Sequence, residues 1–342
     1  MRCRYQYLSV FAAAAIVISS IAAASNMARA DEPLRWKFEV GEKLDYNMVQ
    51  EMNMSAAGGP VGPMNTTMRQ EMDMTWDVQG VDKKTGEAVI KQKFDRVKMK
   101  MQTPVGGFEY DSKSEAAPTG LAAMIAPMYK AMTNGEFEIT MTARGEVKDV
   151  KIPEDVVAAL KSSPGAAAMG DIASAEGFKK MISQGALVLP EAAPKKGDTW
   201  TTKVEMNNPA AGKQTVETTY RYEGTKDIDG TTYAVIKPQL KMDFEKPAAT
   251  AGQPAQQLSM KIADQSSDGE VLFNIAKGRL SSTNLQQKVS IDATVNGQSM
   301  QQKIDQKIDV KVTPSGEKKA DDDAKKTTDE AKKPEASEEK SK

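Results

Sequence analysis

The stretch that decides the fold is DYNMVQEMNM, residues 45–54, which is followed by MRQEMDMTWDV, residues 68–78. Large side chains occupy every second position of both stretches, and mostly acidic or amide side chains stand between them. Successive side chains of a β-strand point to opposite faces of a sheet, so this alternation predicts two strands, each with one apolar and one solvated face. The Gly- and Pro-rich segment 55–63 predicts a hairpin loop between them.

A third strand carries Ala88, Ile90 and Phe94, after which the apolar parity changes to Val97 and Met99. One extra residue near Asp95 and Arg96 would change the parity, which predicts a β-bulge there. The same alternation predicts further strands over 200–206, 216–222, 236–244, 258–262 and 271–275. A last hairpin of 289–295 and 304–312 is predicted to turn at Asn296-Gly297, a strong hairpin signal.

The middle of the chain has helical spacing instead. Leu121, Met124, Ile125, Met128 and Met132 recur at three- and four-residue intervals, after Thr119 and before Asn134-Gly135. This pattern predicts a helix, with Pro127 as a kink or a late start. Two shorter helices are expected to begin at Pro153 and Ser174, with a linker of small residues over 162–170.

The two ends of the chain predict export. Residues 1–30 combine Arg2 and Arg4, an apolar run, and Ala28-Arg29-Ala30 as a small-x-small cleavage signal, which is the pattern of a secretory signal peptide. We expect cleavage there, no membrane span after processing, and a periplasmic or extracellular location. Residues 314–342 have no apolar side chain larger than Ala and predict a disordered charged tail.

Composition excludes several functions. The chain has no His, and its one Cys lies in the predicted signal peptide. The mature chain would therefore lack disulfides, Cys/His metal sites and histidine acid–base catalysis. The formal net charge of −1 gives no electrostatic footprint for nucleic acid, which we exclude as a partner.

An internal repeat is visible in the glycine-containing turns. Gly41-Glu42 matches Gly197-Asp198, and Ala88-Val89-Ile90-Lys91 recurs as Ala234-Val235-Ile236-Lys237, in the same order. We therefore expect a first β-unit over 31–189, with central helices, and a second over 190–313. The alternative is that the matches reflect no true repeat, because any meander of β-hairpins with glycine-containing turns is similar to itself. The expected fold class is α+β, mainly β, with strongly curved antiparallel sheets, in one unit or two, packed on a few central helices.

The segments Leu34-Arg35-Trp36-Lys37-Phe38 and Gly41-Glu42-Lys43-Leu44, with Gly278-Arg279-Leu280, carry a resemblance. Over most of residues 33–312 the chain resembles an uncharacterised exported family of planctomycete-type bacteria, a resemblance that implies no activity, ligand or catalytic residue. The layout of bent sheet plus central helices is also similar to the half-barrels of periplasmic lipid carriers, at the level of the fold alone.

Methionines mark the candidate site. Thioether side chains adapt to apolar ligands, so methionines lining a bent sheet under a methionine-bearing helix predict a pocket for a lipid-like molecule. The candidate residues are Met48, Met52, Met54, Met68, Met72, Met74, Trp76, Met124 and Met128. A closed core and a thioether Cu(I) site are the alternative interpretations; without His or Cys, core packing is favoured over the metal, and no cofactor is expected.

The favoured function is non-enzymatic binding of an apolar or lipid-like ligand. A structural or interaction protein of the cell envelope, with an envelope protein as its partner, is the alternative. A hydrolase with paired carboxylates ranks third, because acidic residues abound but no catalytic motif is complete and no catalytic residue can be named.

Overall fold

The computed structural model describes residues 32–58, 63–162, 174–208, 212–245, 258–295 and 298–316. The predicted signal peptide, the 162–170 linker from residue 163 onward, the Asn296-Gly297 turn and the tail from residue 317 lie outside these ranges. None of the helices within them is long and apolar enough to cross a membrane.

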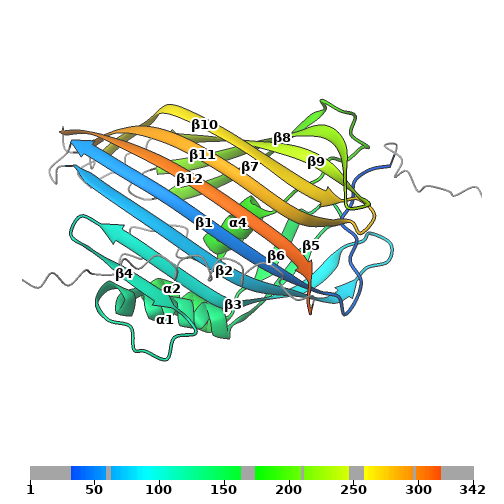
Figure 1. Ribbon diagram of the computed structural model, residues 1–342, viewed down its shortest axis with the longest axis horizontal. Helices are drawn as coiled ribbons and strands as arrows, with labels where there is room; N and C mark the ends of the chain where they lie inside the picture. Colours follow the sequence, from blue (N-terminus) through cyan, green and yellow to red (C-terminus); the bar gives the residue numbers. More distant parts are fainter. Residues whose placement is uncertain are drawn as a thin grey trace, which may run out of the picture.

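One antiparallel sheet of twelve strands dominates the fold (Figure 1). The first half of the chain contributes β1 (Lys43–Gly58), β2 (Met64–Val81), β3 (Ala88–Thr103), β4 (Gly106–Asp111), β5 (Glu136–Met141) and β6 (Val147–Lys151). The second half contributes β7 (Thr199–Asn208), β8 (Gly212–Ile228), β9 (Thr231–Glu245), β10 (Leu258–Asn274), β11 (Arg279–Val295) and β12 (Gln298–Pro314). The mainly β, antiparallel fold class is thus confirmed.

The strands follow the order β6-β5-β3-β2-β1-β12-β11-β10-β9-β8-β7, and β4 pairs with part of β3. The first and last strands along the chain, β1 and β12, meet in the middle, with Met48 opposite Val310. The two halves of the chain therefore share one continuous sheet, and the boundary expected at residue 189 stays a prediction. The sheet is not closed, because β6 and β7 remain edges.

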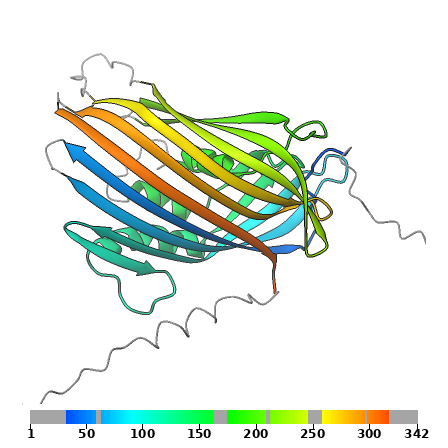
Figure 2. The same cartoon turned by 45° about the horizontal axis from the view of Figure 1, so that its top comes forward.

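Within the described ranges, three helices lie on the inner side of the curved sheet (Figure 2). They are α1 (Gly120–Asn134), α2 (Glu154–Ser162) and α4 (Ala175–Gly185). The predicted starts are confirmed, with Thr119 as N-cap of α1 and the Ser174 hydroxyl accepting the Gly177 N–H. Helix α1 packs on β3 and β4, whereas α4 contacts both edge strands, β6 and β7.

The two halves repeat the same local geometry. The Gly41 N–H donates to the Val78 carbonyl at 2.8 Å, and the Gly197 N–H donates to the Tyr222 carbonyl at 2.7 Å. A register shift follows at Gly80 in one half and at Gly224 in the other. Both glycines of the first pair have positive φ, +84° and +96°, which only glycine adopts at little cost. The turns from which the repeat was predicted therefore share one hydrogen-bond pattern, and the division into two related units stays a prediction.

Strand details agree with the alternation, with two differences. The bulge predicted near Asp95 is confirmed, because the register with β2 shifts between Met74–Phe94 and Asp73–Arg96. Strand β1 continues to Gly58, past the predicted loop start at Ser55, because it pairs with β12 along this length. Strand β10 joins the two separate segments predicted over 258–262 and 271–275.

Candidate functional site

The methionines of β1 and β2 lie on one face of the sheet. Met48 stands directly opposite Met72, and Met52 stands directly opposite Met68. Residues directly opposite in an antiparallel pair point to the same side. We call this surface, made of Met48, Met52, Met54, Met68, Met72 and Met74, the methionine face. It looks toward the interior, because Met68, Met72 and Met74 pack against the buried cluster that includes α1.

The apolar surface continues across the neighbouring strands. Ile304 stands opposite Met54, and Val310 stands opposite Met48. On the next strand, Leu285 and Val289 stand opposite inward-facing residues of β12. The inner surface of the sheet is thus apolar across β2, β1, β12 and β11.

The two ends of this inner surface differ in burial. Val78, Ile90, Ile236 and Phe273, at the end next to the residue 34–38 segment, are at most 1% exposed. Farther along the strands, Met48, Met52, Met54, Ile304 and Ile308 are neither buried nor fully exposed. Solvent therefore reaches the apolar inner face at this second end, toward Gly58 of β1 and Gln298 of β12.

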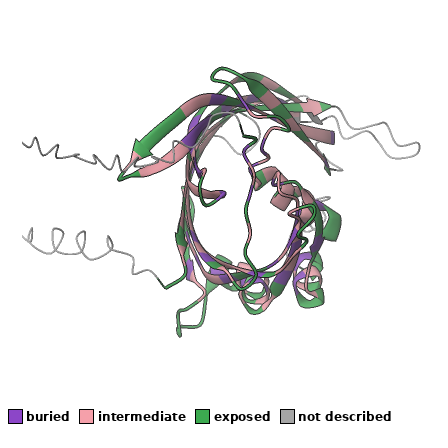
Figure 3. Ribbon diagram, turned by 90° about the vertical axis from the view of Figure 1, so that its right-hand side faces the viewer, coloured by how far each residue is buried: buried purple, intermediate pink, exposed green. Residues whose placement is uncertain are grey.

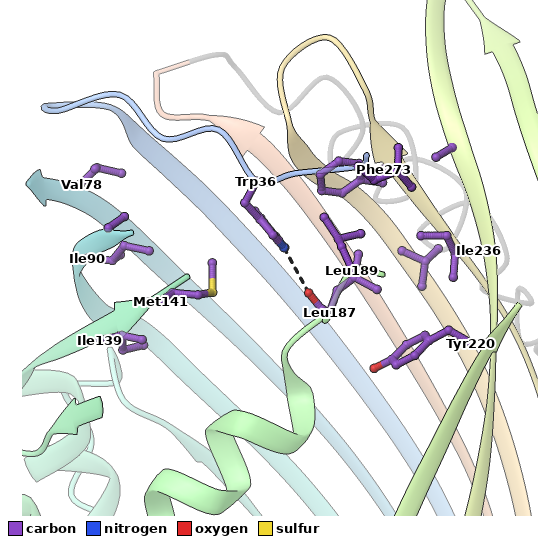
Figure 4. Close-up of a cluster of buried hydrophobic side chains, with 14 of the residues drawn as sticks. Trp36, Val78, Ile90, Ile139, Met141, Leu187, Leu189, Tyr220, Ile236 and Phe273 are labelled. Atoms are coloured by element: carbon purple, nitrogen blue, oxygen red, sulfur yellow. Dashed lines mark hydrogen bonds between the residues drawn. The ribbon is translucent and has the colours of Figure 1, made fainter. Parts of the chain in front are cut away.

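Two chain segments cross the interior and fill the first end. The Trp36 indole N–H donates to the Leu187 carbonyl at 3.1 Å, deep in the cluster (Figure 4). The Trp200 indole N–H donates to the Val188 carbonyl at 2.7 Å, and the Arg144 Nε–H donates to the Leu189 carbonyl at 3.1 Å. These bonds give hydrogen-bond partners to the backbone carbonyls of residues 187–189, which belong to no strand. They hold this segment in the tightly packed first end of the interior, which we call the closed end.

The other predicted site residues divide into two groups. Trp76 joins the inner surface, since its ring centroid lies 4.5 Å from that of Tyr46 and its indole donates to Gln92 at 2.9 Å. Met128 packs against the same cluster as Met68. Met124 is 48% exposed on α1 and is absent from both buried clusters, so the structure does not bring it to the methionine face.

Charge is segregated between the two faces. The inward positions of β1, β2, β11 and β12 within 44–56, 64–78, 283–293 and 300–312 carry no Asp, Glu, Lys or Arg. The outward positions carry ion pairs such as Arg69–Glu51 and Lys288–Asp305. The outer face is therefore the solvated one, and the inner face is the apolar one.

Most polar groups on the inner face are glutamines, which the sequence did not mark as site residues. Gln50 and Gln70 stand opposite each other, and Gln287 stands opposite Gln306. Gln287 is 9% exposed, and its Nε2 has no hydrogen-bond partner among the described residues. Gln287 occupies an alternate position between Leu285 and Val289, and this pattern is the sequence signal that indicates an inward-facing side chain.

Titratable groups near the site are a tyrosine on α1, a tyrosine on β1 and an ion pair at the closed end. Burial, together with Tyr110, raises the pKa of Tyr129 to about 12. Burial raises the pKa of Tyr46 well above its usual range, in spite of the nearby Arg279. Arg279 pairs with Glu42, and each side chain is 15% exposed. None of these groups is a nucleophile poised beside a base, so they form no hydrolytic arrangement.

Of two surface pockets, one reaches the methionine face at Met54. One of about 500 Å³ is bordered by the end of α1 and by β5, including Asn134 and Phe137. Another of about 520 Å³ is lined mostly by outward-facing polar side chains of five strands, such as Asn53, Lys288 and Asp305. Met54 is the one residue that these two pockets share with the candidate set.

Comparisons with known proteins place the chain in a family and find solved structures of low similarity. The model of a family of unknown function, DUF6263, matches residues 85–280. No curated protein matches the chain. A solved lipovitellin structure, described by its lipid–protein interactions, is similar with a TM-score of 0.41 and 10% identity, over 81% of this chain and 26% of that one. The chain thus spans about a quarter of that lipovitellin chain.

Two further solved structures are similar at lower scores. DynF from the dynemicin biosynthesis pathway of Micromonospora chersina has a TM-score of 0.19 and 8% identity, over 82% of this chain and 84% of that one. The COG4313 outer membrane channel from Pseudomonas putida F1 has a TM-score of 0.20 and 8% identity, over 81% and 97%.

Proposed function

We propose that this chain, which belongs to the DUF6263 family of unknown function, is an exported protein that binds an apolar or lipid-like molecule on its methionine face. The observation that carries the proposal is the partial exposure of Met48, Met52 and Met54 on the inner side of a sheet whose other end is packed to near-zero exposure. Folding normally buries such an inner face, and the remaining exposed apolar area favours association with an apolar partner.

The charge distribution supports a small apolar ligand over a protein partner. A docking partner would meet the outer face, where Lys, Arg, Asp and Glu alternate and form ion pairs. The inner face carries methionines, whose flexible thioethers adapt to ligands of different shape. The curvature of the sheet also keeps this surface away from a large flat partner (Figure 3).

The experiment is a titration with N-phenyl-1-naphthylamine, an uncharged apolar fluorophore. The protein is expected to bind it saturably, and Met52→Lys is expected to weaken binding at least about tenfold, because an ammonium group would have to be desolvated on the apolar face. Asn53→Lys is the matched control. It places the same charge one residue away on the outer face, opposite Asp305, and should leave binding unchanged.

Met52→Gln is a second test variant in case Met52→Lys misfolds. It keeps the side-chain length of methionine, introduces no charge and removes only the apolar character. Both Met52 variants are compared with the wild type by urea unfolding. A folded Met52→Lys protein that binds the fluorophore as the wild type does, or a wild type that shows no saturable binding, would rule out the proposed site.

A further inference from the structure

Gln287 is a buried polar side chain with an open hydrogen-bonding atom. It lies between Leu285 and Val289 on the inward side of β11, and its outward neighbours Gln286 and Lys288 are exposed. The row continues through Gln306 and Met52 to Met68 on the methionine face. A buried amide donor without a partner costs free energy in the folded protein, so an acceptor that reaches it is favoured.

Two other carboxamides facing inward donate to weak acceptors. The Gln70 Nε2 lies 3.6 Å from the Met72 Sδ, and the Gln214 Nε2 lies 3.3 Å from the Met242 Sδ. A thioether sulfur is a weak acceptor compared with a carbonyl oxygen. Amide donors are thus distributed over an apolar surface, and an incoming carbonyl would improve their hydrogen bonding.

The nature of these polar groups limits the charge of the ligand. Within 44–56, 64–78, 283–293 and 300–312, the inward positions of β1, β2, β11 and β12 offer amides and the hydroxyls of Thr66 and Thr283, but no Lys or Arg that would neutralise an anion. Transfer of a carboxylate or phosphate to such a surface is unfavourable without a cation or several strong donors. A neutral ester, amide or ketone meets no such penalty.

We infer that the ligand of the methionine face is a neutral amphiphile whose carbonyl accepts a hydrogen bond from Gln287 while its apolar chain lies against Met52 and Met68. This inference rests on the proposed function and specifies its substrate class. Gln287 is a specificity-determining residue in this account, and Gln306, directly opposite, is its neighbour on the polar row.

Three probes with the same C18 chain test the inference by displacement of N-phenyl-1-naphthylamine. Glycerol monooleate has an ester carbonyl, monooleyl glyceryl ether lacks it, and oleate carries a charge. The wild type is expected to bind the ester about five- to tenfold more tightly than the ether, and oleate more weakly than the ester. In Gln287→Leu the preference for the ester over the ether is expected to disappear.

Gln286→Leu is the matched control, because that side chain faces outward and donates to Asp305. It should retain the ester preference. Equal affinities for ester and ether in the wild type, tighter binding of oleate, or an ester preference that survives in Gln287→Leu would each overturn the inference. Those outcomes leave fluorophore binding intact, whereas loss of all saturable binding in the wild type would count against the proposed function itself.

Discussion

The Ser267 hydroxyl takes the place of a backbone partner for Leu240. It accepts the Leu240 N–H at 2.7 Å and donates to the Leu240 carbonyl at 3.4 Å. Gln265 does the same for Met242, with distances of 2.7 and 3.1 Å. The backbone hydrogen-bond ladder between β9 and β10 covers only Val271–Asn274 of β10. Pro238 lies on β9 two residues after Ile236, where the ladder ends, and it has no N–H to donate to β10. Side chains therefore hold the two strands together beyond the proline.

Ser267→Ala is predicted to reduce the free energy of unfolding by about 1–2 kcal/mol, because it leaves the Leu240 N–H and carbonyl without a partner in a half-buried position. Urea unfolding measures the change. Ser266→Ala, on the exposed outward side of the same strand, should change it by less than about 0.5 kcal/mol. Equal effects of the two substitutions would show that the hydroxyl bridge contributes nothing.

Gly145→Ala is predicted to be strongly destabilising, by at least about 3 kcal/mol. The position has φ +90°, and an added Cβ would collide with the Leu187 carbonyl and lie 2.6 Å from the Trp36 Nε1. Gly41→Ala has a similar φ of +84° with nothing within 4 Å, so it should cost only the backbone term of about 1 kcal/mol. Tryptophan fluorescence followed through urea unfolding gives both values. If the two costs were equal, the close contact at Gly145 would be wrong.

Arg279→Met is predicted to cost about 3–5 kcal/mol, because the mostly buried Glu42 carboxylate would lose its cation. The double variant Glu42→Leu/Arg279→Met should recover most of this loss, since it removes both charges. Urea unfolding of the two single variants and the double variant measures the coupling. Simple additivity of the single effects would contradict an ion pair between these residues.

Alkaline pH is predicted to destabilise the fold through Tyr129. Its pKa rises from 10 to about 12 in the folded state, so the unfolded chain releases this proton first as pH increases. The stability contributed by the neutral phenol is complete below pH 10 and is lost as pH rises toward 12. Between pH 8 and pH 11 the wild type should lose about 1.4 kcal/mol more than Tyr129→Phe. Parallel stability profiles of the two proteins would argue against this assignment.

Local alternation predicts much of this fold because a strand's period of two is visible in the sequence itself. Met48 and Met72 could be placed on one face, and the bulge at Asp95 follows from a parity change. The pairing of β1 with β12 could not be predicted, since it joins segments more than 240 residues apart and no short turn sets its register. The repeated turns were visible because positive φ requires glycine.

Polar residues caused an incorrect strand prediction in β10 and made part of the candidate site hard to recognise from the sequence. In the sequence, the polar Gln265 and Ser267 suggest a break between two strands. In the structure, their side chains are hydrogen-bond partners for β9 rather than solvated groups. The polar Gln287 looks like a surface residue until its parity with Val289 is compared. The exposure of Met124 likewise depends on how α1 rotates on β3, which helical spacing does not specify.

The central claim is that an apolar ligand lies on the inner face of the sheet, and photo-crosslinking locates it directly. A glycerol monooleate analogue with a diazirine in its acyl chain is photolysed with the protein, and labelled peptides are identified by mass spectrometry. The account predicts labelling within residues 48–54, 68–74 and 304–310, which unlabelled monooleate suppresses. Labelling confined to outward-facing residues, or labelling that unlabelled monooleate does not reduce, would contradict it.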